Sequence, residues 1–168
     1  NGSGLENMVC RILKMMGLDA KYSGVGSDDG RDILANEKIE SQMGVCERRW
    51  LVECKDKTVS KRAVSKTEVG ILDHCSQHKC DSYLLVTTTQ PSAGLVKKME
   101  NITEDESHSI SASFWNREKL IEILYKSEFE SVLREYLPES YKRTKGLSPG
   151  EEVSVDRDID QIIEYLDL

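Results

Sequence analysis

Residues 82–89 (SYLLVTTT) constrain the fold more than any other stretch of the chain. Successive residues of a strand point to opposite faces of a sheet, and this run places leucine and valine on both faces. A strand that is apolar on both faces must be covered on both, so we expect it at the centre of a sheet with helices on either side. The run therefore predicts an α/β fold.

The remaining segments supply the other elements of such a fold. Residues 5–16 carry apolar side chains at helical spacing and are followed by Gly17, which predicts a first helix. Residues 37–48 are polar and irregular, and predict either a long hairpin loop or a pair of ragged strands. With residues 82–89, the predicted strands are residues 18–24, 31–36, 49–55, 82–89 and 107–115. The other helices are predicted at residues 58–79, 90–101 and 117–126, the last capped by Asn116. We expect a mixed central sheet of about five strands, flanked by helices on both faces.

The composition is typical of a globular domain, with 38% hydrophobic and 32% charged residues among 168. No apolar run approaches the roughly 18 residues that a membrane helix needs, so we expect no membrane partner. Five cysteines at irregular spacing favour reduced thiols over a disulfide framework, and hence a cytoplasmic protein. The opening NGSG, without methionine, resembles a cloning remnant, so we expect a domain that belongs to a longer protein.

Charge is distributed unevenly along the chain. We expect residues 5–137 to form one domain and residues 138–168 to form a linker followed by a short acidic helix. The net charge of −7 arises mainly in residues 150–168, which hold seven acidic side chains and one basic one. By contrast, residues 48–66 hold seven basic and two acidic side chains. This local basic segment is either a footprint for a polyanion or a solvated surface without a partner.

The basic segment contains a carboxylate and an amine two residues apart. In a strand, Glu53 and Lys55 point to one face while Cys54 points to the other. Asp32 begins a strand that we expect to lie next to this one. Two carboxylates that meet at adjacent strand ends provide the oxygen ligands that Mg²⁺ prefers, with Mn²⁺ as a substitute. Such an ion activates water and offsets phosphoryl charge, while Lys55 orients the attacking water or stabilises the pentavalent phosphate.

The pattern Asp-x(n)-Glu-x-Lys on consecutive strands resembles the PD-(D/E)xK nuclease superfamily, and the surrounding sequence is similar to its Mrr-like restriction endonuclease branch. The resemblance rests on four stretches that occur in order: LENMVCRILKMMGLDAK, GSDDGRDI, LVECKDK and SFWNREKLIEIL. It spans roughly residues 5–137, which would be the nuclease domain. The chain departs from the family pattern at Asp29, where glycine is usual.

The resemblance implies a restriction-endonuclease-like fold and a metal-dependent DNA endonuclease. It implies that Asp32 and Glu53 bind the metal ion and that Lys55 is the catalytic lysine. It also implies that Glu6, on the first helix, holds a metal-bound water or a second ion. The resemblance further implies that the chain is the effector domain of a larger prokaryotic restriction or antiphage defence protein.

Two further expectations concern DNA and assembly. The charges that follow the motif predict contacts with DNA phosphates by Lys57, Lys61 and Arg62. Nucleases that cut both strands commonly pair two active sites, so we expect a homodimer or a higher oligomer.

Other interpretations remain open from the sequence. Glu53 and Lys55 would also suit a surface ion pair, and Glu6 would suit an acid at a helix N-terminus. A zinc site is another interpretation, with four candidate ligands: His74, Cys75, His78 and Cys80. No second ligand pair stands at the spacing of a zinc finger, which argues against it. The alternative functions are a structure-selective nuclease, such as a Holliday-junction resolvase, and a non-catalytic nucleic-acid-binding or assembly module with a nuclease-like fold. The intact catalytic set argues against the non-catalytic module.

Overall fold

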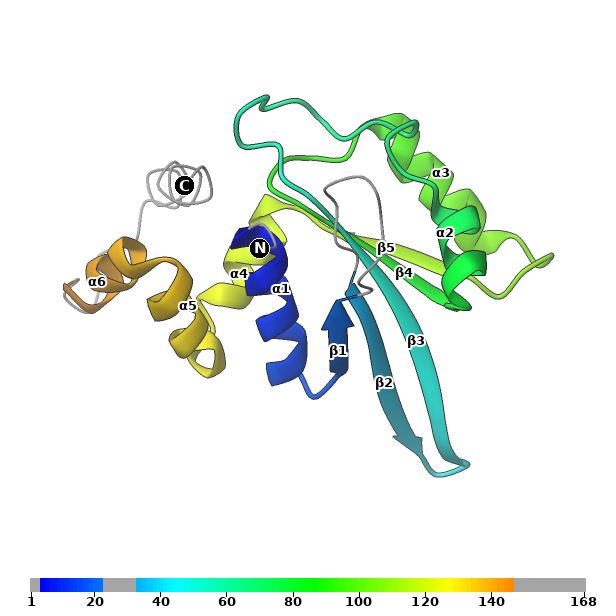
Figure 1. The fold of residues 1–168 in the computed structure, drawn as a ribbon, viewed down its shortest axis with the longest axis horizontal. Coiled ribbons are helices and arrows are strands. Elements are labelled where there is room, and N and C mark those ends of the chain that lie inside the picture. Colours follow the sequence, from blue (N-terminus) through cyan, green and yellow to red (C-terminus); the bar gives the residue numbers. More distant parts are fainter. Residues whose placement is uncertain (1–3, 23–32, 147–168) are drawn as a thin grey trace.

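The computed structural model of the protein describes residues 4–22 and 33–146 (Figure 1). In chain order its elements are α1 (Gly4–Met15), β1 (Asp19–Tyr22), β2 (Ile33–Ser41), β3 (Gly44–Lys55), α2 (Ile71–His78), β4 (Ser82–Thr87), α3 (Ala93–Glu104), β5 (Ser111–Trp115), α4 (Arg117–Leu124), the 3₁₀ helix η1 (Ser127–Phe129), α5 (Glu130–Tyr136) and α6 (Pro138–Gly146). The predicted first helix, the five strands and the helix after Asn116 are confirmed. The predicted cap is confirmed as well, because the Asn116 side chain accepts a hydrogen bond from the N–H of Lys119.

The five strands form one mixed sheet in the order β1-β2-β3-β4-β5. The first three strands pair antiparallel, and β4 pairs parallel with both β3 and β5. All six residues of β4 are buried, as expected for a strand that is apolar on both faces. Residues 37–48 form two strands rather than a loop, because β2 and β3 pair as a long hairpin out to Ser41 and Gly44.

Helices cover both faces of the sheet, as predicted (Figure 1). Helices α1, α4 and α5 pack on one face, where Val52 of β3 joins their hydrophobic core. Helices α2 and α3 pack on the other face, around a second core that contains Leu51. Because successive residues of β3 alternate between the two cores, Glu53 and Lys55 lie on the face covered by α2 and α3, and Cys54 lies on the opposite face.

The segment between β3 and α2 differs from the prediction. The sequence predicts one helix over residues 58–79, whereas α2 covers only the last part of that range. Two apolar residues of that range do not behave as one buried face of a helix, because Val64 is buried outside any helix and Leu72 is 41% exposed. Lys61 and Arg62, which fall in the predicted range, lie in non-helical backbone.

Contacts with other parts of the chain explain this irregular path. The Asp56 carboxylate accepts hydrogen bonds from the N–H and the hydroxyl of Thr58, at 3.0 and 2.6 Å, which favours a turn over a helix. Further along, Val64 forms a parallel bridge with Pro91, which precedes α3. Tertiary pairing of this kind overrides local helix propensity and leaves no pattern in the sequence.

A second difference concerns the start of the expected linker. Pro138–Gly146 forms helix α6, which packs beside α5 (Figure 1). Proline suits the first position of a helix, and Tyr141 packs against the core and donates its hydroxyl to Glu130 at 3.0 Å. The polar composition of this segment concealed the helix. The expected acidic helix lies outside the described residues, so the division into 5–137 and 138–168 stays a prediction.

Candidate active site

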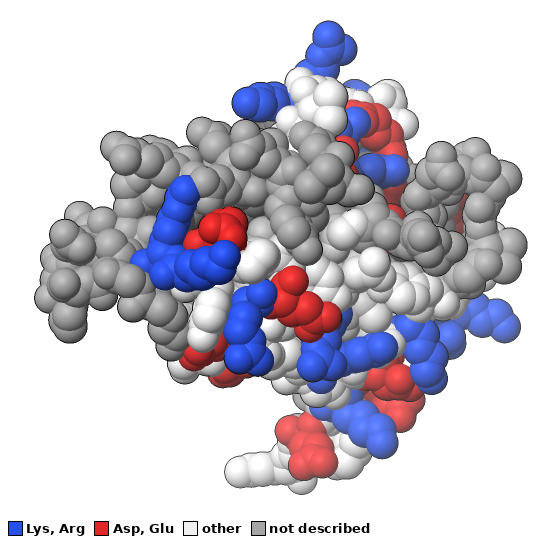
Figure 2. All heavy atoms as spheres, turned by 60° about the vertical axis from the view of Figure 1, so that its left-hand side comes forward, with Lys and Arg blue, Asp and Glu red and all other residues white. Residues whose placement is uncertain are grey.

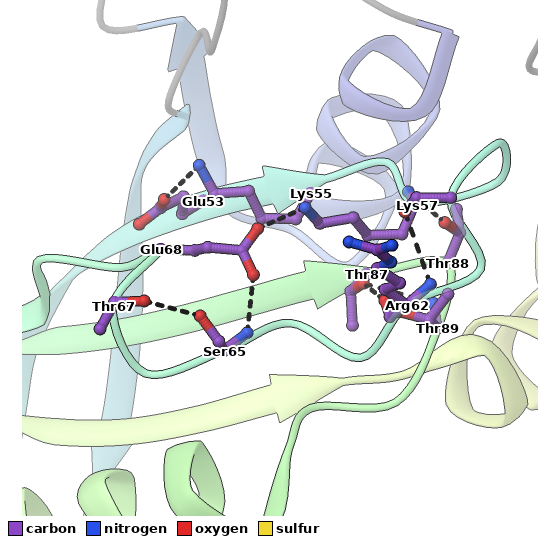
Figure 3. A network of polar contacts seen from close by, with 11 residues as sticks. Glu53, Lys55, Lys57, Arg62, Ser65, Thr67, Glu68, Thr87, Thr88 and Thr89 are labelled. Carbon is purple, nitrogen blue, oxygen red and sulfur yellow. Dashed lines mark hydrogen bonds and ion pairs between the residues drawn. The ribbon is translucent and has the colours of Figure 1, made fainter.

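The end of β3 brings a carboxylate and an ammonium group together on one face of the sheet. β3 stays paired with β4 as far as Lys55, so strand geometry extends through the whole motif. Glu53 is 4% exposed, and its Oε1 atom lies 2.9 Å from Nζ of Lys55 (Figure 3). The Lys55 side chain is 30% exposed and therefore reaches solvent. The structure thus places these two predicted site residues in direct contact.

Two side chains from other elements complete the surroundings of Glu53. The hydroxyl of Tyr83, on β4, donates a hydrogen bond of 2.7 Å to Oε2 of Glu53. His74, on α2, has its Nδ1 atom 3.7 Å from the same oxygen. A buried carboxylate requires partners of this kind, because an unpaired buried charge is strongly destabilising. The sequence gives no local signal for Tyr83, since it lies 30 residues away along the chain.

The predicted acidic residue of the first helix is also buried, but it approaches from a different direction. Glu6 is 3% exposed and lies near Tyr22, whose pKa rises to about 12, mainly through burial and in smaller part through nearby acidic groups that include Glu6. Helix α1 packs on the face opposite to Glu53, with its N-terminus at the end of the sheet where β3 finishes (Figure 1). Glu6 lies in the first turn of α1.

The predicted metal ligand Asp32 lies outside the described residues. Its neighbour Ile33 begins β2 and is the cross-strand partner of Val52. The described part of β2 therefore starts one residue after Asp32, next to the position on β3 that precedes Glu53.

A cavity of about 300 Å³, lined in part by charged and hydroxyl side chains, opens at the ends of β3, β4 and β5. Two of the three predicted DNA-contacting residues, Lys57 and Lys61, line it, whereas Arg62 does not. Arg62 lies close by, because its carbonyl oxygen accepts a hydrogen bond of 3.1 Å from the hydroxyl of Thr89 (Figure 3). The cavity is also lined by Arg117, which sequence reasoning missed. Its position directly after β5 was the available signal, because ligands commonly bind beyond the carboxyl ends of parallel strands.

Lys57 forms an ion pair with Glu68 rather than standing alone. Its backbone N–H also donates to the hydroxyl of Thr88 at 2.8 Å, which fixes the loop after β3 against the loop after β4 (Figure 3). The hydrogen bond from Lys57, together with one from the N–H of Ser65, lowers the pKa of Glu68 to about 2. Glu68 therefore orients Lys57 and offsets part of its charge.

We expect the ion pair of Glu68 to stabilise the protein in a pH-dependent manner. Because the pKa falls from its usual 4.5 to about 2, the stabilisation is complete above pH 4.5 and is lost as the pH falls toward 2. Glu68→Gln should lower the free energy of unfolding by about 1 kcal/mol or less at pH 6, since the pair is partly exposed. Urea unfolding at pH 6 and pH 3 measures this, with Glu40→Gln on the exposed hairpin as the control. If Glu68→Gln lowered the free energy of unfolding equally at both pH values, the pH-dependent stabilisation by this ion pair would be contradicted.

The surface around α1, α5 and α6 has mixed charge. On the face drawn in Figure 2, Lys and Arg side chains are interspersed with Asp and Glu side chains. The described residues of that face form no extended basic surface, so the cavity at the ends of β3, β4 and β5 is the more specific candidate for binding phosphate.

Zinc binding by the cysteines near α2 is disfavoured. Cys75 lies in the core, and burial raises the pKa of its thiol to about 12, whereas zinc requires a thiolate. Within residues 4–22 and 33–146, no group of three or more His, Cys, Asp or Glu side chains is arranged to hold a metal ion.

In the same part of the chain, no helix is both long enough and apolar enough to cross a lipid bilayer.

Comparison with known protein families and solved structures relates the chain to restriction endonucleases. The model of the Mrr_cat family, described as restriction endonuclease, matches residues 1–124. No curated protein matches the sequence. Among solved structures, the DNA modification-dependent restriction endonuclease AspBHI is similar over 98% of this chain, with a TM-score of 0.54 and 17% identity. The chain spans 34% of the length of AspBHI. A protein of unknown function, AF1548, is 16% identical, with a TM-score of 0.47 over 98% of this chain and 96% of its own. The likeness to AspBHI confirms the predicted restriction-endonuclease-like fold.

Proposed function

Because the chain belongs to the Mrr_cat restriction endonuclease family, we propose that it is a metal-dependent DNA endonuclease of the PD-(D/E)xK type that hydrolyses phosphodiester bonds. The observation that carries this proposal is the buried Glu53 carboxylate, which contacts the Lys55 ammonium and the Tyr83 hydroxyl at the end of β3. An ordinary surface ion pair adds little to stability, so stability alone gives no reason to bury this carboxylate.

The chemistry of Glu53 suits a hard divalent cation. Each carboxylate oxygen has two lone-pair positions, so the contacts with Lys55 and Tyr83 leave capacity for a metal ion. We propose Mg²⁺, with Mn²⁺ as a substitute, bound by Glu53 and Asp32. When bound, such a cation supplies Lewis-acid stabilisation of the phosphodiester and activates water.

The place of Asp32 in the chain supports its role as the second ligand. A peptide link keeps the Cα atoms of Asp32 and Ile33 about 3.8 Å apart. Ile33 pairs with Val52, and Val52 directly precedes Glu53. The start of β2 therefore lies beside the residue that precedes Glu53, which supports the proposal that Asp32 and Glu53 share one cation.

Lys55 is the proposed catalytic lysine. Its ammonium group is fixed by the Glu53 carboxylate and is partly open to solvent, which suits a group that contacts substrate. It orients the attacking water or stabilises the charge that develops on phosphoryl oxygens in the transition state. Glu6, buried near the same end of the sheet, is the proposed holder of a second water or ion.

The cavity beside the site is the proposed place of DNA backbone contact. Lys57 and Lys61 line it, and Arg62 lies against Thr89 at its margin. Arg117 adds a further cation to its wall. Contacts of this kind position a phosphate backbone without reading base sequence.

The chain spans about a third of AspBHI, which supports a role as one part of a larger protein. We propose that residues 5–137 are the nuclease domain of a cytoplasmic prokaryotic restriction or antiphage defence protein. A homodimer or higher oligomer would allow two sites to cut the two strands of a duplex.

Incubation with supercoiled plasmid tests the proposal. We expect nicked and linear products with Mg²⁺ or Mn²⁺ and intact plasmid with EDTA, because the cation is required for hydrolysis. Methylated and unmethylated plasmid should both be used, so that a dependence on modification is not mistaken for inactivity. A four-way junction, compared with linear duplex of the same length, distinguishes a resolvase from a general endonuclease. Cleavage that is equal with and without EDTA would contradict metal dependence.

A further inference from the structure

His74 has an unusual position beside the proposed active site. It projects from α2 toward the end of β3, where its Nδ1 atom lies 3.7 Å from Oε2 of Glu53. This separation is too long for a hydrogen bond. The His74 side chain is 41% exposed, but its Nδ1 atom is buried and makes no hydrogen bond with any described residue. A buried polar atom without a partner is rare and calls for an explanation.

The start of α2 leaves room for this imidazole. The residue that caps α2 is Gly70, and a Cβ atom added there would lie 3.0 Å from Nε2 of His74. A side chain at this position would require the ring to shift by a few tenths of an ångström, since nine in ten real Cβ contacts are longer than this. Gly70 and His74 therefore form a matched pair in which the glycine accommodates the ring beside Glu53.

The distance between the two atoms suits ligands of one metal ion. Nitrogen and oxygen ligands lie about 2.0–2.2 Å from a divalent ion such as zinc, so two ligands are roughly 3.0 Å apart at right angles and roughly 4.2 Å apart when opposed. The observed 3.7 Å between Nδ1 of His74 and Oε2 of Glu53 falls within this range. A cation bound between them would also contact the buried Nδ1 atom, which makes no hydrogen bond with any described residue.

We propose that His74 is an additional ligand of the cation at Glu53, through Nδ1, and that it gives the site a preference for Mn²⁺ over Mg²⁺. The inference rests on the proposed function, because it assumes that Glu53 binds a divalent cation. Mg²⁺ favours oxygen ligands, whereas imidazole nitrogen favours transition metals. A site that adds one imidazole to its carboxylate ligands should therefore bind Mn²⁺ more tightly than a site of carboxylates alone.

The proposal makes His74 different in kind from Tyr83. Tyr83 is a positioning residue, since its hydroxyl donates to Oε2 of Glu53 and holds the carboxylate in place. His74 makes no such hydrogen bond, and as a ligand it would contact the ion itself. A merely structural histidine would not change which metal is preferred.

Metal binding by the full chain tests this without relying on activity. Mn²⁺ titration followed by electron paramagnetic resonance gives the affinity, and competition with Mg²⁺ gives the preference. We expect His74→Ala to weaken Mn²⁺ binding about tenfold or more while Mg²⁺ binding changes far less. Electron spin-echo modulation of bound Mn²⁺ should show a directly coordinated nitrogen in the wild type and none in His74→Ala. His78→Ala, on the same helix, is the matched control and should behave like the wild type.

Two further variants separate ligation from packing. His74→Phe keeps a ring against Gly70 without a ligand nitrogen, so it should bind Mn²⁺ as weakly as His74→Ala even if the alanine variant folds poorly. His74→Asp supplies oxygen in place of nitrogen and should shift the preference toward Mg²⁺.

The outcomes distinguish this inference from the proposed function. Mn²⁺ bound by the wild type without nitrogen coordination, or bound equally by His74→Phe, would overturn the role of His74 and leave the nuclease proposal intact. A wild-type protein that binds neither cation would overturn both.

Discussion

Lys55→Ala is expected to reduce the rate of plasmid nicking by about 10²-fold or more, because it removes a positioned charge that stabilises the transition state. The Lys55 ammonium lies 2.9 Å from Glu53 and remains partly open to solvent, so it can contact both the carboxylate and a phosphate. The measurement is the initial rate of conversion of supercoiled to nicked plasmid with Mg²⁺ or Mn²⁺. Lys38→Ala, on the β2–β3 hairpin, is the matched control because it removes an exposed lysine away from the site.

Loss of activity must be separated from loss of fold. Removing Lys55 leaves the buried Glu53 with Tyr83 as its hydrogen-bond donor, so some destabilisation is expected. Circular dichroism and the thermal midpoint show whether Lys55→Ala is folded at the assay temperature, and Lys55→Arg supplies a variant that keeps the charge. A folded alanine variant that nicks plasmid as fast as the wild type would remove Lys55 from the mechanism.

The sheet could be predicted because its signals are local. Residues 82–89 showed by their own pattern that both faces of β4 are buried, and the first helix showed its apolar stripe and its terminal Gly17. The path of residues 56–70 could not be predicted in the same way. It depends on the bridge between Val64 and Pro91 and on the turn at Asp56, which join segments that are separate in the sequence or compete with a helix.

In the candidate site, too, the local pattern could be predicted and the contacts between distant segments could not. The alternation of a strand is enough to place Glu53 and Lys55 on one face, and the structure has them in contact. The side chains that surround Glu53 come from β4 and α2, and nothing near the motif indicates that Tyr83 or His74 would meet it. The ion pair of Lys57 with Glu68 was hidden for the same reason, because it depends on the irregular path between β3 and α2.

Glu53→Gln should separate metal binding from catalysis most clearly. The amide has nearly the same shape as the carboxylate and can still accept a hydrogen bond from Tyr83, but it lacks the charge that holds a divalent cation. We therefore expect plasmid nicking to fall about 10²-fold or more, as for Lys55→Ala, and Mn²⁺ affinity to fall as well. Lys55→Ala should retain Mn²⁺ binding, so the two variants lose the same activity for different reasons.

Thermal unfolding provides an independent measurement of cation binding by the Glu53→Gln variant. A ligand that binds only the folded state raises the unfolding midpoint, so Mn²⁺ should stabilise the wild type and Lys55→Ala but not Glu53→Gln. Without metal, Glu53→Gln should unfold at a temperature equal to or above that of the wild type, because it replaces a charge that is only 4% exposed with a neutral group. Stabilisation of Glu53→Gln by Mn²⁺ to the same extent as the wild type would show that the cation binds elsewhere. The Glu53 carboxylate would then be a structural partner of Lys55 and Tyr83, because its charge would have no cation to hold.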